Sequence, residues 1–93
     1  MQEPARTLRT KLNAHALTKG MCVRVYGTHL IAGRPVRGDE EPDDRVRLSR
    51  LGGSRWGLSA RLHTGRWERT PFTGTIDELV EVMQTFMQHL VAS

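Results

Sequence analysis

The chain of 93 residues has a single cysteine, Cys22, and only five aromatic residues. One cysteine excludes a disulfide within the chain, and such sparing use of cysteine is typical of a reducing compartment. The sequence has no run of roughly 18 apolar residues that would predict a membrane-spanning helix. Its polar N-terminal segment lacks the apolar stretch of a signal peptide. We therefore expect a cytoplasmic protein with no membrane partner.

The residue spacings that metal binding and catalysis require are also absent from the sequence. The four histidines and Cys22 form no C-x-x-C, H-x-x-x-H or H-E-x-x-H pattern. No serine lies in a nucleophile-elbow context, and no glycine-rich loop has the pattern of a phosphate cradle. Acidic residues gather in one loop and at one helix start, where solvation and helix capping account for them. We expect no metal, no cofactor and no enzymatic activity.

Lysine is scarce, and arginine supplies twelve of the fourteen cationic side chains. The net charge is +4, but the charge is uneven along the chain. Residues 39–44 include five acidic residues, whereas residues 45–70 include seven arginines against one glutamate. Guanidinium groups pair with phosphate and carboxylate and stack on flat rings. Coding bias toward GC-rich DNA also produces arginine in place of lysine, so the excess alone does not decide a function.

The clearest predicted element is a C-terminal helix from about residue 76 to about residue 91. Thr75 and Glu78 have the spacing of a capping box, which marks a helix start. A weaker apolar spacing predicts an additional N-terminal helix over residues 4–18. The apolar stripe of the C-terminal helix comprises Ile76, Leu79, Val80, Met83, Phe86, Met87, Leu90 and Val91.

Strand signals occupy the middle of the chain. Alternating polar and apolar residues predict strands over 45–50 and 55–63, joined by a glycine-rich turn. Residues 38–44 are predicted to form an exposed acidic loop. Strand composition also occurs in residues 21–26, 30–31 and 66–70, the last of these stopped by Pro71.

These signals predict one α+β domain over residues 1–93. Its antiparallel sheet has three to five short strands and is packed on one face by the amphipathic C-terminal helix. The run Gly20–Gly27 is similar, over that run only, to the opening strand of small SH3-like barrels. A small, partly closed barrel is therefore the alternative to an open sheet.

Alternation also sorts the strand side chains into two faces. An apolar set is expected to face the helix and comprises Val23, Val25, Val46, Leu48, Trp56, Leu58, Ala60 and Leu62. Trp67 is expected either to offer a stacking surface or to pack against the start of the C-terminal helix. The opposite face and its surroundings supply the candidate binding residues, which are Arg24, Arg45, Arg47, Arg55, Arg61, Arg66 and Trp67.

The arginine-rich face predicts a small non-enzymatic binding module. The first hypothesis is a protein-interaction or regulatory role, with an acidic protein partner or a homodimer that uses Leu30, Ile31 and Val82. The alternative is a nucleic-acid-binding module that uses the arginine-rich face, with binding that is mostly electrostatic. An ordinary solvated face also accounts for the arginines, because charged side chains discourage pairing between sheet edges.

Overall fold

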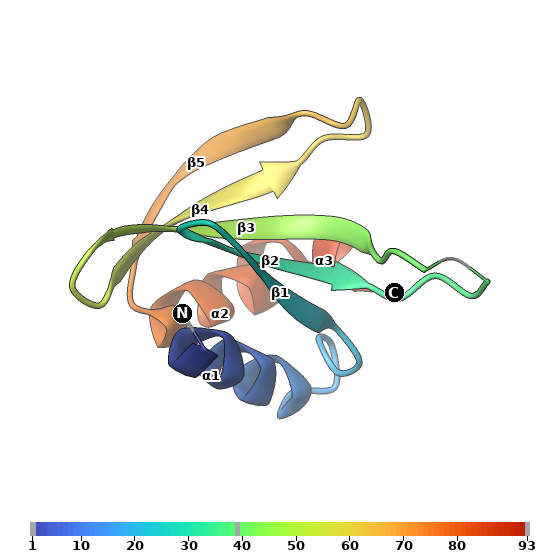
Figure 1. The fold of residues 1–93 in the computed structure, drawn as a ribbon, viewed down its shortest axis with the longest axis horizontal. Coiled ribbons are helices and arrows are strands. Elements are labelled where there is room, and N and C mark those ends of the chain that lie inside the picture. Colours follow the sequence, from blue (N-terminus) through green and yellow to red (C-terminus); the bar gives the residue numbers. More distant parts are fainter. Residues whose placement is uncertain (1, 39, 93) are drawn as a thin grey trace.

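Figure 1 shows the fold in a computed structural model, which describes residues 2–38 and 40–92. The strands pair antiparallel in the order β1-β2-β3-β4-β5 and form one open sheet. This α+β architecture confirms the predicted fold class, and the sheet is open rather than a closed barrel. The elements are α1 (Gln2–Asn13), β1 (Cys22–Tyr26), β2 (His29–Arg34), β3 (Asp43–Gly52), β4 (Arg55–Arg61), β5 (Trp67–Gly74), α2 (Ile76–Phe86) and α3 (Gln88–Val91).

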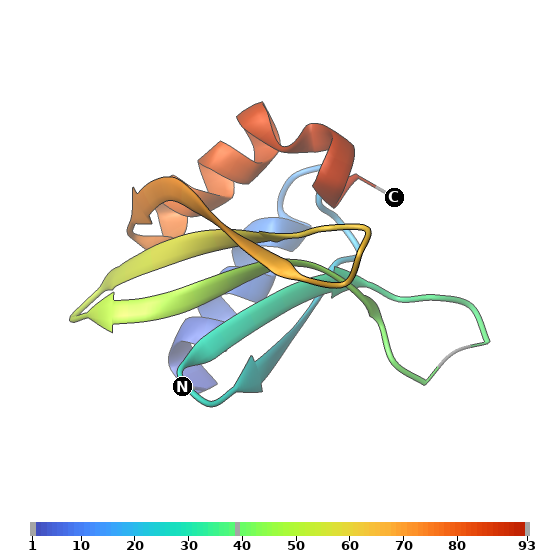
Figure 2. The ribbon, with the colours of Figure 1, turned by 90° about the horizontal axis from the view of Figure 1, so that it is seen from above.

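The helices lie together on one face of the sheet, and no described helix covers the other face (Figures 1 and 2). Helix α1 packs against α2 and β1, α2 packs against β4 and β5, and α3 packs against β3. The core between the layers includes Leu8, Leu12, Val46, Leu48, Trp56, Leu58, Leu79 and Met83, all buried. The predicted burial of Val46, Leu48, Trp56 and Leu58 against the helices is therefore confirmed.

The C-terminal helical region is divided at Met87, whereas the sequence predicts one continuous helix. The capping box at its start is confirmed, because the Thr75 hydroxyl accepts from the Glu78 amide at 3.2 Å. Met87 adopts φ −123° and ψ 30°, which ends α2 before α3 begins. Phe86, expected in the buried stripe, is 66% exposed and stacks on Phe72 with ring centroids 5.9 Å apart.

The edges of the sheet depart from the sequence predictions. Strand β5 continues through Pro71, which the sequence predicts as its end. Pro71 lies close to the point where the register between β4 and β5 shifts. Proline is tolerated at such an irregularity because it has no amide proton to donate to the neighbouring strand. Val25, expected in the core, is 44% exposed because it lies on the edge strand β1. Of the proposed dimer contacts, Leu30 and Ile31 are buried and Val82 packs partly against the core.

The predicted acidic loop and N-terminal helix have different bounds in the structure. Asp43 and Asp44 belong to β3, while Glu40 and Glu41 are exposed, and Asp39 lies outside the described residues. Helix α1 ends at Asn13, five residues before the predicted end. No helix in the described ranges is both long enough and apolar enough to cross a membrane.

Candidate functional site

The sheet face without helices carries two rows of side chains that the strand register aligns. Since cross-strand partners point to the same face, each row crosses all five strands. The first row is Arg24, Ile31, Arg47, Ser59 and Arg69, and the second is Tyr26, His29, Ser49, Gly57 and Thr73. We call this surface the open face.

A bulge between β2 and β3 decides which charges reach the open face. The register shifts between Ala32 and Gly33, so that Gly33 pairs with Asp44 and Arg45 is the additional residue. Only glycine fits at position 33, because a Cβ there would lie 2.6 Å from the carbonyl oxygen of Asp43. The bulge turns Asp44 toward the open face and Arg45 toward the helices.

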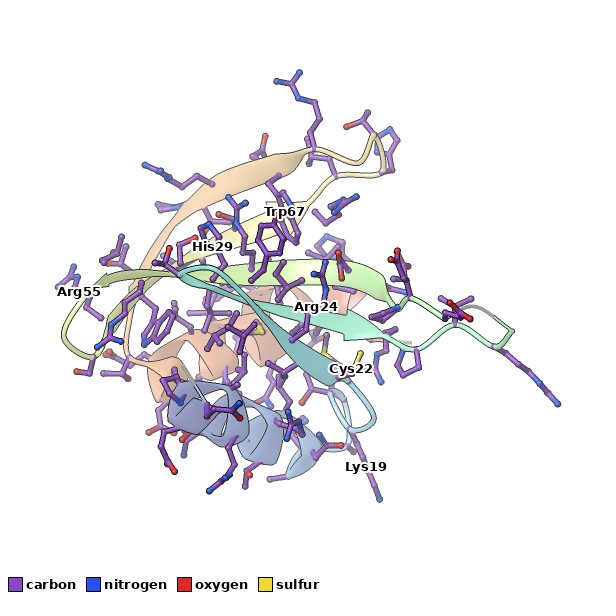
Figure 3. All side chains as sticks on the ribbon, in the orientation of Figure 1. Lys19, Cys22, Arg24, His29, Arg55 and Trp67 are labelled. Carbon is purple, nitrogen blue, oxygen red and sulfur yellow. The ribbon has the colours of Figure 1, made fainter. Side chains whose placement is uncertain are left out.

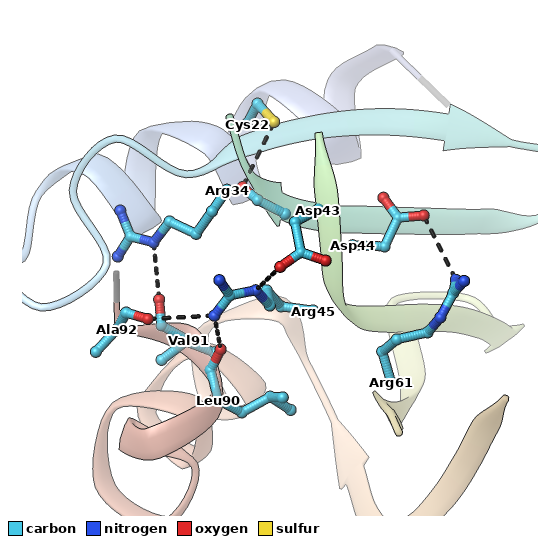
Figure 4. A network of polar contacts seen from close by, with 10 residues as sticks. Cys22, Arg34, Asp43, Asp44, Arg45, Arg61, Leu90, Val91 and Ala92 are labelled. Atoms are coloured by element: carbon cyan, nitrogen blue, oxygen red, sulfur yellow. Dashed lines mark hydrogen bonds and ion pairs between the residues drawn. The ribbon is translucent and has the colours of Figure 1, made fainter. Parts of the chain in front are cut away.

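The prediction that Arg45 lies on the face opposite the helices is therefore wrong. Its guanidinium donates hydrogen bonds to the carbonyl oxygens of Leu90 at 2.7 Å and Ala92 at 3.3 Å (Figure 4). Arg34 from β2 donates to the adjacent carbonyl of Val91 at 2.9 Å, and burial together with the nearby Arg45 lowers the pKa of Arg34. These two arginines satisfy carbonyl groups that the end of a helix leaves without partners.

Three of the predicted arginines converge with Trp67 around one hollow on the open face. The hollow has a volume of about 330 Å³, and we call it the basic hollow. In Figure 3, His29 and Trp67 lie on the side of the sheet away from the helices. The lining residues are Arg24, Tyr26, His29, Ile31, Asp44, Arg47, Arg61 and Trp67.

Trp67 is one of the two residues, with Tyr26, that give the basic hollow an aromatic lining. The guanidinium carbon of Arg47 lies 5.0 Å from the centroid of the Trp67 ring, and that of Arg61 lies 5.2 Å away. At such distances, cations are attracted to the ring face. The buried Nε of Arg47 has no hydrogen-bond acceptor among the described residues. Trp67 thus lies on the open face, and the alternative of packing against the C-terminal helix is wrong.

Asp44 is the one acidic side chain that lines the basic hollow within the described ranges. Its Oδ2 accepts a hydrogen bond from Arg24 at 2.8 Å and lies 3.6 Å from a terminal nitrogen of Arg61. The hydrogen bond to Asp44 raises the pKa of Arg24 above its ordinary value, despite partial burial that lowers it. Three arginines and one aspartate therefore leave this hollow with a positive charge.

A second, smaller hollow of about 140 Å³ adjoins the basic hollow and shares Arg47 with it. We call it the hydroxyl hollow; its lining includes Arg69, Ser49, Ser59, Thr70 and Thr73. Arg55 lies beside it and donates to the Thr73 hydroxyl at 2.9 Å. Arg66 is exposed in the loop before β5 and lines neither hollow.

Several lining residues were not among the sequence candidates. His29, whose Nδ1 lies 2.8 Å from the Ser49 hydroxyl, sits at the start of a strand that the sequence signal detects only at its centre. Arg69 lies two residues after Trp67, so strand alternation places both side chains on the same face. This spacing is the sequence signal that could have identified Arg69. Asp44 was missed because the bulge cannot be seen in the sequence.

Comparison with known proteins adds no assignment to this geometry. No family model matches the chain, and no match was found among the curated proteins or the solved structures. In residues 2–38 and 40–92, no group of three histidine, cysteine, aspartate or glutamate side chains is placed to hold a metal ion.

Proposed function

We propose that this protein is a small binding module that holds single-stranded nucleic acid on the open face of its sheet. The observation that carries the proposal is the convergence of Arg24, Arg47 and Arg61 with Trp67 in the basic hollow. Single-strand-binding surfaces combine a positively charged groove with aromatic rings on which bases stack. A cytoplasmic location is part of the proposal and is supported by the single, free Cys22.

The geometry favours a nucleic acid over an acidic protein as the ligand. An acidic peptide needs only cations, whereas a nucleic acid also needs a flat partner for its bases. The two arginines beside Trp67 have their guanidinium groups next to an aromatic ring, and guanidinium groups themselves stack on bases. The hydroxyl hollow continues the surface past Arg47 and supplies neutral donors for sugar and phosphate oxygens.

The test is a fluorescence anisotropy titration of labelled oligonucleotides of about 12 nucleotides, a length within the range that small single-strand-binding folds cover. We expect binding to single strands that exceeds binding to the matching duplex. With three arginine contacts, log K should fall with log salt concentration at a slope of about −2 between roughly 50 and 200 mM. Absence of binding to any single strand at about 50 mM salt would remove the proposal.

Trp67 supplies an independent readout in the same titration. Its ring is half-buried on the open face, whereas the second tryptophan, Trp56, is buried beneath the helices. Base stacking should quench Trp67 fluorescence, and the quench should disappear in Trp67→Phe. Trp67→Ala should weaken binding about tenfold, since base stacking on an aromatic ring contributes roughly 1–3 kcal/mol. A quench that persists in Trp67→Phe would place the bases elsewhere.

Pairing with another protein chain is the second candidate function, and one separate observation favours it. Strand β1 is an edge of the sheet, and its side chains Val25 and Tyr26 are exposed. An exposed edge strand can pair with the same strand of a second copy and extend the sheet. This candidate predicts a mass of twice 10.5 kDa by size exclusion with light scattering, with no shift by oligonucleotide. A monomer at all concentrations would exclude the homodimer.

A further inference from the structure

We propose that Arg24 and Arg61 form a phosphate site and that the carboxylate of Asp44 occupies this site when no ligand is bound. This inference rests on the proposed function, because the ligand phosphate is taken to be that of a nucleic acid strand. The two arginines come from β1 and β4, at either side of β3, and Asp44 lies between them. One oxygen of Asp44 is shared between both guanidinium groups.

The geometry around Asp44 is that of a partly satisfied anion site. The contact with Arg24 is a full hydrogen bond at 2.8 Å, but the 3.6 Å separation from Arg61 is too long for one. A phosphate group has more acceptor oxygens than a single carboxylate oxygen offers, and guanidinium forks bind it through two parallel bonds. A bound phosphate would therefore satisfy Arg61 in a way that Asp44 does not.

Asp44 is held at this position by the backbone. The bulge opposite Gly33 turns its side chain to the open face, where the side chain is 14% exposed. The Arg24 side chain remains 46% exposed, so a ligand can reach its guanidinium from solvent. Glu41 is the other acidic group whose charge acts on Arg24, but Glu41 is exposed in the preceding loop.

The neighbouring Asp43 provides a matched control for Asp44. Asp43 pairs with Arg45 at 3.0 Å, and Arg45 is the arginine that the bulge turns toward the end of α3 (Figure 4). Asp43→Asn and Asp44→Asn change the net charge equally and alter adjacent residues of one strand. Only Asp44→Asn releases arginines of the basic hollow.

The experiment measures affinity for a single-stranded oligonucleotide and, separately, for inorganic tripolyphosphate. We expect Asp44→Asn to bind the oligonucleotide about fivefold more tightly than wild type, which is the upper range for one exposed ion pair. Its salt slope should be steeper than that of wild type, because the Asp44 carboxylate no longer offsets one of the three arginine charges. Asp43→Asn should change affinity by less than about twofold, because charges on the far face are screened.

The outcomes separate this inference from the proposed function. Equal affinities for Asp44→Asn and Asp43→Asn, or weaker binding by Asp44→Asn, would mean that Asp44 orients the arginines and does not stand in for phosphate. If no variant binds oligonucleotide but Asp44→Asn binds tripolyphosphate more tightly than Asp43→Asn, the phosphate site stands and the nucleic-acid function fails. Circular dichroism verifies the fold of each variant, and Asp44→Ser replaces Asp44→Asn if the latter does not fold.

Discussion

The double variant Arg47→Glu with Arg61→Glu is expected to bind single-stranded nucleic acid at least about a hundredfold more weakly than wild type. Both guanidinium groups line the basic hollow and lie against Trp67. Loss of a hydrogen bond to a charged group costs roughly 1.5–3 kcal/mol, so two such losses correspond to about 3 kcal/mol or more. The introduced carboxylates also repel phosphate, and anisotropy at low salt measures the change.

The matched control is Arg9→Glu with Lys19→Glu. This variant changes the net charge by the same amount, but both residues are exposed, one on α1 and the other in the loop after it. We expect the control to reduce affinity only slightly, through the weakened long-range field. Equal losses in both double variants would mean that net charge alone holds the ligand, and the basic hollow would then have no specific role.

The fold should survive the double substitution. Arg61 forms a long ion pair with Asp44, and Arg47 makes no ion pair among the described residues. Exposed ion pairs contribute about 0–1 kcal/mol, so the loss of these contacts is small beside the total stability of a domain. A melting temperature close to that of wild type would therefore attribute the lost binding to the open face.

The sequence predicts the centre of this fold well because the middle parts of β3 and β4 alternate between polar and apolar residues. Val46 and Leu48 on β3 and Trp56 and Leu58 on β4 are buried against the helices, as their parity requires. Arg47 and Arg61 share the opposite parity and line the basic hollow. A strong alternating pattern with one covered face fixes register, since a shift of one residue would expose the whole apolar set.

The bulge at Asp44 shows where alternation stops being informative. Counting parity backward from Val46 assigns Arg45 to the open face, but the additional residue in β3 reverses that assignment for Arg45 and Asp44. The cause is the close approach of Gly33 to the backbone of Asp43 on the facing strand. That approach depends on strand pairing, which a single sequence does not contain.

The face of the sheet on which Trp67 lies could also not be predicted from the sequence. The segment before Pro71 is short, and Pro71 suggests a strand end, so no register could be assigned. In the structure Trp67 pairs with Arg61 on β4 and its ring also reaches Arg47 on β3. The sequence names Trp67 as a candidate, but its position beside Arg47 and Arg61 is set by the pairing of strands in the tertiary structure.

Leu79→Ala is expected to cost about 2–5 kcal/mol of the free energy of unfolding, whereas Phe86→Ala should cost less than about 1 kcal/mol. The apolar spacing of the helix predicts that both residues are buried, but Leu79 is 1% exposed and Phe86 is 66% exposed. Truncating Leu79 leaves a cavity between α2 and the sheet. Truncating Phe86 removes a surface stack on Phe72 and opens no cavity.

Urea unfolding followed by circular dichroism measures both costs on the same scale. A domain of this size has a total stability of roughly 5–14 kcal/mol, so Leu79→Ala removes a large share of it and lowers the unfolding midpoint strongly. Phe86→Ala should leave the midpoint close to wild type, because the Phe86 side chain is already 66% exposed at the end of α2. Similar midpoints for the two variants would mean that Phe86 is buried in solution, as the apolar stripe of the sequence predicts.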